Sequence, residues 1–361
     1  MNIFYLRRIS FVFLISAFVT CVTAQTGCPQ VNAGADVSLP CGTNCTNLTA
    51  TFFQTGATTD YTVSSIPYTP PYAFTGGTQI IIQDDDIWSD SIALPFTFCF
   101  YGNSYNKVVI GANGLISFDL TEATNYCEWS YSASIPTPGP PSAGIYNNSI
   151  NGAYHDIDPS VFSFSCFCYP ADINYAILGT APCRTLVVNF NKVPHFSCNS
   201  LQTTQQIVLY ETTNVIEVYI DDKPTCSTWN SGNAVIGLQN IDGSMGITPP
   251  GRNTGPWTAH HEAWRFTPSG PSIVTIDWFN GATQVGTGAT INVCPGGNTT
   301  YTAQATYLPC AGGTPVVVTD NVNVSLAGAL QAGIDSSHNV TCFGASNGTA
   351  YAHATTSNSG L

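Results

Sequence analysis

The chain has 361 residues, of which 43% are hydrophobic and only 8% are Asp, Glu, Lys or Arg, with a formal net charge of −13. Soluble domains carry about 25% charged residues, so this composition excludes a coiled coil, an array of long solvated helices and a charge-rich disordered chain. Eight basic side chains cannot neutralise a phosphate backbone, which excludes nucleic acid as a partner. The acid excess also disfavours an anionic membrane surface. The length allows two or three domains that each bury a core.

Residues 1–24 have the pattern of a secretory signal peptide. Arg7 and Arg8 precede the apolar run 9–22, and small residues lead to a cleavage site after Ala24. A membrane anchor is the alternative, but the apolar run is too short to span a bilayer. We therefore expect a secreted, extracellular protein that is attached to the cell surface without a transmembrane segment in the mature chain.

Residues 25–60 form a short Cys-containing β segment. Its alternation of apolar and polar residues is typical of part of a small β-sandwich, or of an entry strand pair for the next domain.

Alternation with a period of two dominates residues 61–269. Each run is short and is bounded by Gly, Pro, Asn or Asp, and Asn113-Gly114 between two runs predicts a tight hairpin. No segment predicts a helix of three turns. We therefore predict an all-β fold in which this region is a large antiparallel β-sandwich or jelly roll. The clearest predicted strands span 94–101, 107–112, 115–119, 174–178, 184–190, 205–211, 214–220 and 234–238.

Two further segments follow the main domain. Residues 270–327 are predicted to form an Ig-like domain, because of their size, the Trp278 that follows the first strand, and two cysteines. Residues 328–361 begin a further unit that has too few strands to bury a face. We expect the natural protein to continue beyond Leu361.

Fourteen cysteines, one of them in the leader, indicate disulfide bonds in an oxidising compartment. The remaining number is odd, so at least one thiol lacks a partner within the chain. The spacing predicts one bridge from Cys294 to Cys310 and leaves Cys342 unpaired. The disulfide candidates are Cys28, Cys41, Cys45, Cys99, Cys127, Cys166, Cys168, Cys183, Cys198, Cys226, Cys294 and Cys310.

Two stretches resemble known families. Asn339–Ala350, with its Cys-Phe-Gly-x-x-Asn-Gly core, resembles the opening of the SprB-type repeat of Bacteroidetes surface adhesins. Leu94–Asn103 and Gly111–Phe118 resemble the N-terminal region of secreted Bacteroidetes proteins and, more distantly, the nidogen-type extracellular (NIDO) domain, in which an Asp-x-Asp strand follows, here Asp156-Ile157-Asp158. The resemblance implies surface display, adhesion or gliding motility, and export by type IX secretion.

Two acidic groups could bind a metal ion. Asp84-Asp85-Asp86 is a run of three carboxylates, and Asp156 and Asp158 would share one face of a strand. Carboxylate oxygens are the ligands that calcium prefers, so both groups are candidate calcium sites. The alternatives are a solvated loop for the first group and an Asp-Pro turn for the second.

Four tryptophans are candidate binding residues. Trp88, Trp129, Trp229 and Trp257 lie in loop-like sequence near Asn, Asp, Pro or Gly. Aromatic side chains at loop tips of β-sandwiches can stack on sugars, and they can equally pin a loop to its own sandwich.

No nucleotide-binding, nucleophile-elbow or zinc-hydrolase motif is present in the sequence. We therefore expect no enzyme activity and no cofactor, with calcium as the one candidate ion. The expected function is that of an extracellular cell-surface adhesin or surface-structural protein, the N-terminal part of a longer chain. A lectin-like carbohydrate-binding module, with or without calcium, is the alternative. The expected partner is an extracellular glycan or protein surface.

Overall fold

The computed structural model describes residues 27–356 except 41, 81–83, 132, 142–143, 164–166, 170, 327–329 and 345. Within these residues the chain consists of strands, turns and short 3-10 helices, and it contains no α-helix. The predicted all-β fold with antiparallel sheets is confirmed. The described residues also contain no helix with the length and apolar character needed to cross a membrane. The predicted leader, residues 1–24, lies outside the described part.

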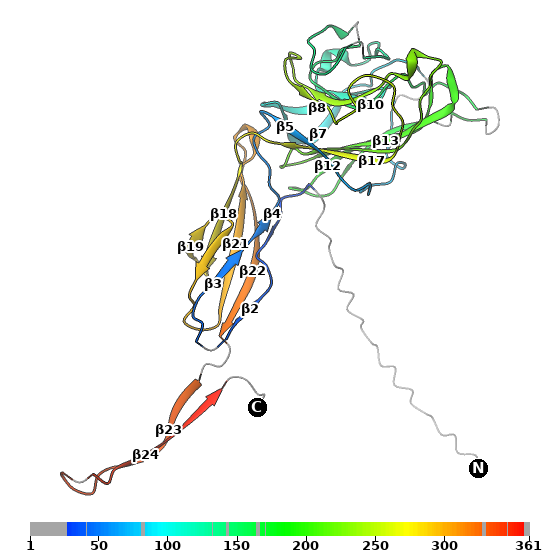
Figure 1. The fold of residues 1–361 in the computed structure, drawn as a ribbon. Helices are drawn as coiled ribbons and strands as arrows, with labels where there is room; N and C mark the ends of the chain where they lie inside the picture. Colours follow the sequence, from blue (N-terminus) through cyan, green and yellow to red (C-terminus); the bar gives the residue numbers. More distant parts are fainter. Residues whose placement is uncertain are drawn as a thin grey trace, which may run out of the picture.

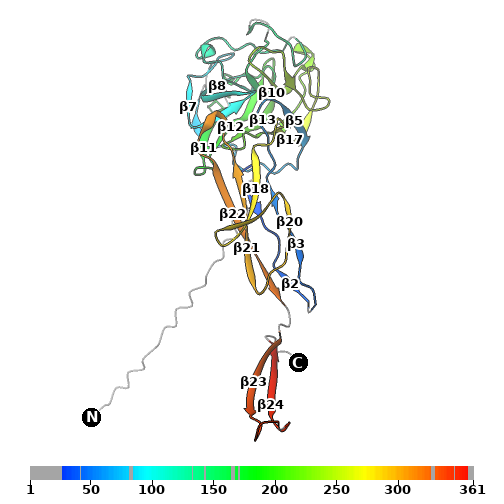
Figure 2. The same cartoon turned by 90° about the vertical axis from the view of Figure 1, so that its left-hand side faces the viewer.

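The chain forms a head, a stem and a terminal hairpin (Figure 1). The head comprises residues 55–269, the stem combines residues 31–52 with 274–326, and the hairpin comprises residues 330–356. In both views the stem extends away from the head as a narrower body (Figure 2).

The head is a sandwich of two antiparallel sheets. The six-stranded sheet has the order β16-β15-β10-β9-β8-β7 and the seven-stranded sheet the order β5-β17-β14-β13-β12-β11-β6. The first contains β7 (Ile92–Phe100), β8 (Asn103–Gly111), β9 (Leu115–Ser117), β10 (Ser149–Tyr154), β15 (Val235–Gln239) and β16 (Gly246–Ile247). The second contains β5 (Tyr61–Ser65), β6 (Thr78–Gln79), β11 (Asp172–Leu178), β12 (Thr185–His195), β13 (Cys198–Tyr210), β14 (Ile216–Lys223) and β17 (Ala259–Pro268). The 3-10 helices η1 (Leu120–Glu122) and η3 (Asn230–Gly232) lie in loops.

Alternation along the strands builds the core of the head. In β7 the apolar residues Ile92, Leu94 and Phe96 are buried while the residues between them are exposed, as the pleat of a strand requires. The inward side chains of the two sheets form one cluster, in which Phe98 joins Ile207 of the opposite sheet. Face-to-face packing of two such sheets is the sandwich that the period-two pattern predicts.

The stem is built from two parts of the chain that lie far apart in sequence. Its five-stranded sheet has the order β19-β18-β21-β22-β2, and two short pairs, β20–β3 and β1–β4, complete it. The early strands are β1 (Val31–Asn32), β2 (Val37–Leu39), β3 (Thr46–Thr49) and β4 (Thr51–Phe52). The late elements are β18 (Val274–Asn280), β19 (Thr283–Thr287), β20 (Thr290–Val293), β21 (Thr299–Tyr307), η4 (Cys310–Gly312) and β22 (Val316–Leu326).

The opening segment therefore completes the core of the stem. Strand β2 pairs with β22 in parallel, and β3 pairs with β20 antiparallel. Leu39 and Leu48 are buried in one cluster with Trp278 and Tyr301. Of the two readings of residues 25–60, a part of a small β-sandwich fits the structure.

The terminal hairpin consists of β23 (Leu330–His338) and β24 (Thr349–Thr356), which within the described residues pair only with each other. The Cys-Phe-Gly-x-x-Asn-Gly core forms the connection between them. There the side chain of Asn347 accepts a hydrogen bond from Thr341 N (3.1 Å) and donates one to Thr341 Oγ1 (2.9 Å). The thiol of Cys342 is exposed and free.

Four disulfides connect described cysteines: Cys28–Cys183, Cys45–Cys294, Cys99–Cys310 and Cys198–Cys226. The predicted Cys294–Cys310 bridge is wrong, because the β3–β20 pairing places Cys294 beside Cys45, whereas η4 places Cys310 beside β7. Cys99–Cys310 connects the stem to the head, and Cys28–Cys183 connects the segment directly before β1 to the head. Cys168 is also disulfide-bonded, and Cys41 and Cys166 lie outside the described residues.

Cys127 is not a disulfide cysteine. Its thiol is free and fully buried, in a cluster with Trp88, Val109 and Leu115. The prediction that Cys127 is bridged is therefore wrong, because apolar side chains surround a thiol that faces no second cysteine among the described residues.

Candidate functional site

The first wall of the site is the loop that carries Asp85 and Asp86. Directly after it, Ile87 bridges Tyr126 and Trp88 bridges Gly111. Trp88 is only 1% exposed, so its burial anchors the loop at the edge of the head. The prediction that Trp88 offers a binding face is therefore wrong.

The second wall is the loop after β10. Every residue of β10 is buried, and so are His155 and Ile157 on either side of Asp156. Ile157 forms a bridge to His195. Because both neighbours are buried in the head, Asp156 lies below the surface as well, and only 7% of its surface is exposed.

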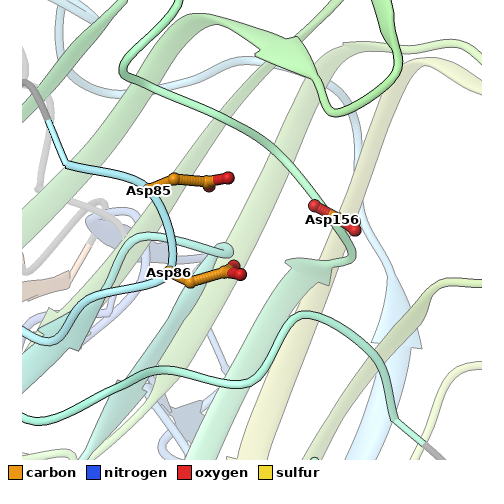
Figure 3. Close-up of side chains that lie close together, drawn as sticks. All are labelled: Asp85, Asp86 and Asp156. Atoms are coloured by element: carbon orange, nitrogen blue, oxygen red, sulfur yellow. The ribbon is translucent and has the colours of Figure 1, made fainter.

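The two loops bring three carboxylates together (Figure 3). One oxygen from each of Asp85, Asp86 and Asp156 lies within 4.8 Å of the others. Asp84 is exposed and does not belong to this cluster. Asp158 also stays outside it, because its Oδ1 accepts hydrogen bonds from Ser160 N (2.8 Å) and Ser160 Oγ (2.5 Å), which is the turn that the alternative predicted.

Neighbouring donors hold part of the cluster in place. Asp86 Oδ1 accepts from Asn113 Nδ2 (2.7 Å) and Asp86 Oδ2 from Tyr126 Oη (3.0 Å). Asp156 Oδ2 accepts from Trp229 Nε1 (2.6 Å). Two buried oxygens remain without a hydrogen-bond partner, Asp85 Oδ1 and Asp156 Oδ1. Outside donors therefore orient Asp86 and Asp156, while one oxygen of Asp85 and one of Asp156 stay unsatisfied.

Asn113 is a positioning residue, although the Asn113-Gly114 pattern in the sequence predicts only a turn. Its side chain is fully buried; it donates to Asp86 Oδ1 and accepts from Ile157 N (3.0 Å), which joins the two acidic loops. Gly114, at φ +94°, allows the close approach, because a Cβ there would lie 2.6 Å from the carbonyl oxygen of Ala153. An Asn-Gly hairpin signal does not indicate whether the Asn faces solvent or a second loop, so this role was missed.

The surroundings raise the pKa of the acidic side chains. Burial, and then the neighbouring carboxylates, raise the pKa of Asp85 to about 7. Burial also raises the pKa of Asp156 to about 7, against the hydrogen bond from Trp229. No ion pair among the described residues involves any of the three. Burial and mutual repulsion therefore favour either protonation of these carboxyl groups or a bound cation.

An aromatic group borders the cluster. The half-buried ring of Trp229, which donates to Asp156, lies 5.7 Å from the ring of Trp129 and 4.9 Å from that of Phe196, measured between centroids. Trp129 is half-buried too. Of the four predicted tryptophans, Trp129 and Trp229 therefore reach the surface beside the acidic cluster. Phe196 was not predicted. We call Asp85, Asp86, Asp156, Trp129 and Trp229 the acidic–aromatic face.

Trp257 lies elsewhere and is buried. Its Nε1 donates to the carbonyl oxygen of Ala234 (3.0 Å). Lys223 Nζ lies 4.5 Å and Arg252 Cζ 4.8 Å from its ring centroid. The prediction that Trp257 is a binding residue is wrong, because the ring is covered by two cations and the core of the head.

Comparison with known proteins identifies the family of the head. No curated protein and no solved structure matches the chain. The family model described as NIDO related matches residues 60–269, which is the head and more than half of the chain. The chain therefore belongs to the NIDO-related family.

Proposed function

We propose that this chain is a non-catalytic extracellular attachment protein, an adhesin or surface-structural protein, whose head contacts the target and whose stem holds the head away from the cell. The observation that carries the proposal is the covalent connection of head and stem. Cys99–Cys310 joins the stem to the head, and Cys28–Cys183 joins the segment directly before β1 to the head. An attachment protein under tension needs such a junction, whereas a domain that acts alone in solution does not.

Hydrogen bonds at the junction support the same function. Thr213 Oγ1 of the head donates to the carbonyl oxygen of Gly27, in the segment before β1 (2.5 Å), and Ala57 N donates to that of Pro271, in the linker before β18 (2.8 Å). Gly56 packs against Gly270 so closely that a Cβ at Gly56 would lie 2.2 Å from the carbonyl oxygen of Gly270. Two disulfides and a close-packed backbone restrict bending between the two bodies.

The resemblances favour a bacterial surface. Membership of the NIDO-related family fits an extracellular β domain. The SprB-like sequence at Asn339–Ala350 extends the proposal to surface attachment or gliding in Bacteroidetes, with an Ig-like stem and export by type IX secretion. The low charge would keep single contacts weak, so that many copies together provide attachment.

The test is an immunoblot of intact source cells with an antibody against residues 61–269, before and after treatment with external protease. The proposal predicts a cell-associated band that the protease removes, with a cytoplasmic protein as the intact control. A band found only in the culture medium would contradict surface attachment.

The second candidate function is carbohydrate binding. It rests on Trp129 and Trp229, two half-buried rings beside carboxylates that could accept hydrogen bonds from sugar hydroxyls. On a glycan array, Trp129→Ala should reduce the signal at least tenfold, while Tyr351→Ala, an exposed aromatic in the hairpin, should leave it unchanged. An array without any signal for the unmodified chain would remove this candidate.

A further inference from the structure

We infer that Asp85, Asp86 and Asp156 form a calcium-binding site that ties the loop before Trp88 to the loop after β10. The inference goes beyond the attachment function and does not depend on it. It rests on three observations about these loops, which concern distance, hydrogen bonding and charge.

The distances match a calcium ion. Calcium binds oxygen at about 2.3–2.6 Å, so two ligands on opposite sides of the ion lie about 5 Å apart. One oxygen from each of the three carboxylates lies within 4.8 Å of the others. A single calcium ion can therefore contact all three without movement of the backbone. Magnesium demands near-ideal octahedral geometry and gives up its water reluctantly, so a site made of protein carboxylates favours calcium.

The hydrogen bonds leave a place for a ligand. Asp156 is more than nine-tenths buried, and Trp229 fixes one of its oxygens while the other, Oδ1, has no partner. Asp85 Oδ1 is also buried without a partner. Figure 3 shows the side chains of Asp85, Asp86 and Asp156 turned toward one another. An unpaired buried carboxylate oxygen is costly, and a cation at the centre of the cluster satisfies both oxygens at once.

The charges point in the same direction. The three carboxylates are held together with no basic side chain paired to any of them among the described residues, and Asp158 adds to the repulsion felt by Asp85. In the described part of the chain, the side-chain donors that touch the cluster come from Asn113, Tyr126 and Trp229, and these donors are neutral. Positive charge is therefore missing where it would be most stabilising, and calcium supplies two units of it.

The test is a calorimetric titration of calcium chloride, up to about 10 mM, into the full chain after removal of metals with a chelator. Extracellular calcium modules bind in the range of about 10⁻⁴–10⁻³ M, and we expect one site per chain in that range or tighter. Asp156→Asn should weaken binding at least tenfold. Asp84→Asn is the matched control, because it removes the same charge from an exposed side chain next to the cluster, and it should change the affinity less than twofold.

A second measurement, on the unmodified chain, keeps the inference testable if Asp156→Asn does not fold. Calcium should raise the Tm of the unmodified chain by about 5 °C at saturation, and excess magnesium should not reproduce the shift. Terbium should show luminescence sensitised by Trp229, and calcium should displace it. Absence of both heat and Tm shift at pH 8, where protons leave the carboxylates, would overturn the inference. Equal effects of Asp84→Asn and Asp156→Asn would overturn it too, because they would show non-specific charge attraction only.

Discussion

The head and the stem are both β-structures, but they bury different chemistry. Among the described residues, every buried polar or charged side chain lies between Thr55 and Asn240, outside the strands of the stem. The stem core consists of apolar and aromatic residues around Trp278 and Tyr301. The head buries polar groups such as Asn113, His195 and Asp156.

This difference is the one expected between a stem that acts as a spacer and a head whose loops contact a target. A sheet with a purely structural role can place apolar residues inside and polar residues outside along the whole length of each strand. Burying a polar group stabilises a fold only when its partners are in place, so such groups accumulate where loops must be held in one conformation. In the head, Asn113 and Trp229 hold the loops of the acidic–aromatic face.

The largest expected effect is a loss of stability that is confined to the core of the stem. Trp278→Ala should lower the free energy of unfolding by about 4 kcal/mol, because it removes a fully buried indole and leaves a cavity. Hydrogen exchange should show lost protection in 31–52 and 274–326 and retained protection in β12 and β13. Val317→Ala, at a 51% exposed position of the stem, is the control with little effect. Equal loss of protection in the head would show that head and stem unfold as one unit.

The covalent link across the junction can be removed by two small substitutions. Cys99→Ser combined with Cys310→Ser removes a cross-link between residues 211 positions apart and should cost about 3 kcal/mol. Small-angle scattering should show a wider distribution of head–stem distances. Cys198→Ser with Cys226→Ser, a bridge within the head, is the control that should leave this distribution unchanged. An unchanged distribution in both variants would contradict the role proposed for the junction.

A smaller effect is expected at the positioning residue of the site. Asn113→Ala should cost about 2 kcal/mol in a denaturant titration, because it leaves buried partners of the amide without hydrogen bonds. Asn103→Ala, at an exposed position of β8, should cost less than about 0.5 kcal/mol. Equal stability of the two variants would mean that Asn113 does not hold the loops.

The smallest effect is a dependence on pH that belongs to the head. Burial lowers the pKa of His195 to about 4 and lowers that of His155 as well. The unfolded chain therefore takes up protons first, so this contribution to stability is complete above about pH 6.5 and is lost as the pH falls toward 4. The loss should reach about 1 kcal/mol for His195 at pH 5.5.

The variant His195→Gln isolates the contribution of this histidine to the pH dependence of stability. It is needed because Asp85 and Asp156 change the stability in the opposite direction as the pH falls. Their raised pKa values stabilise the folded head as the pH falls from about 7 toward 4. The difference in unfolding free energy between the unmodified chain and His195→Gln, measured from pH 7.5 to 5.5, cancels the carboxylate contribution. A difference that is constant with pH would contradict a buried neutral His195.

Local patterns in the sequence predict the strands but not what they bring together. The alternation in Ile92–Phe100 and the Asn113-Gly114 turn indicate β-structure because both are set by nearby residues. The pairing of Cys45 with Cys294 spans 249 positions and depends on which strands become neighbours. Spacing within a short segment could not supply that information, and it led to the wrong Cys294–Cys310 bridge.

The same reason explains the outcome at the site. Five acids were predicted as two separate calcium candidates, and three of them meet because Trp88 is buried and β10 ends beside the loop that carries Asp85 and Asp86. Trp88 and Trp129 both lie in polar sequence, yet only tertiary packing decides that one is buried and the other reaches the surface.

The central claim is that the head makes the contact and the stem only positions it. The most direct measurement is the retention of beads coated with the full chain on a surface of source cells under flow. The account predicts that Trp129→Ala on the acidic–aromatic face reduces retention at least tenfold, while Val317→Lys on the exposed side of the stem leaves it within twofold. Retention that survives the head variant and is lost in the stem variant would contradict it.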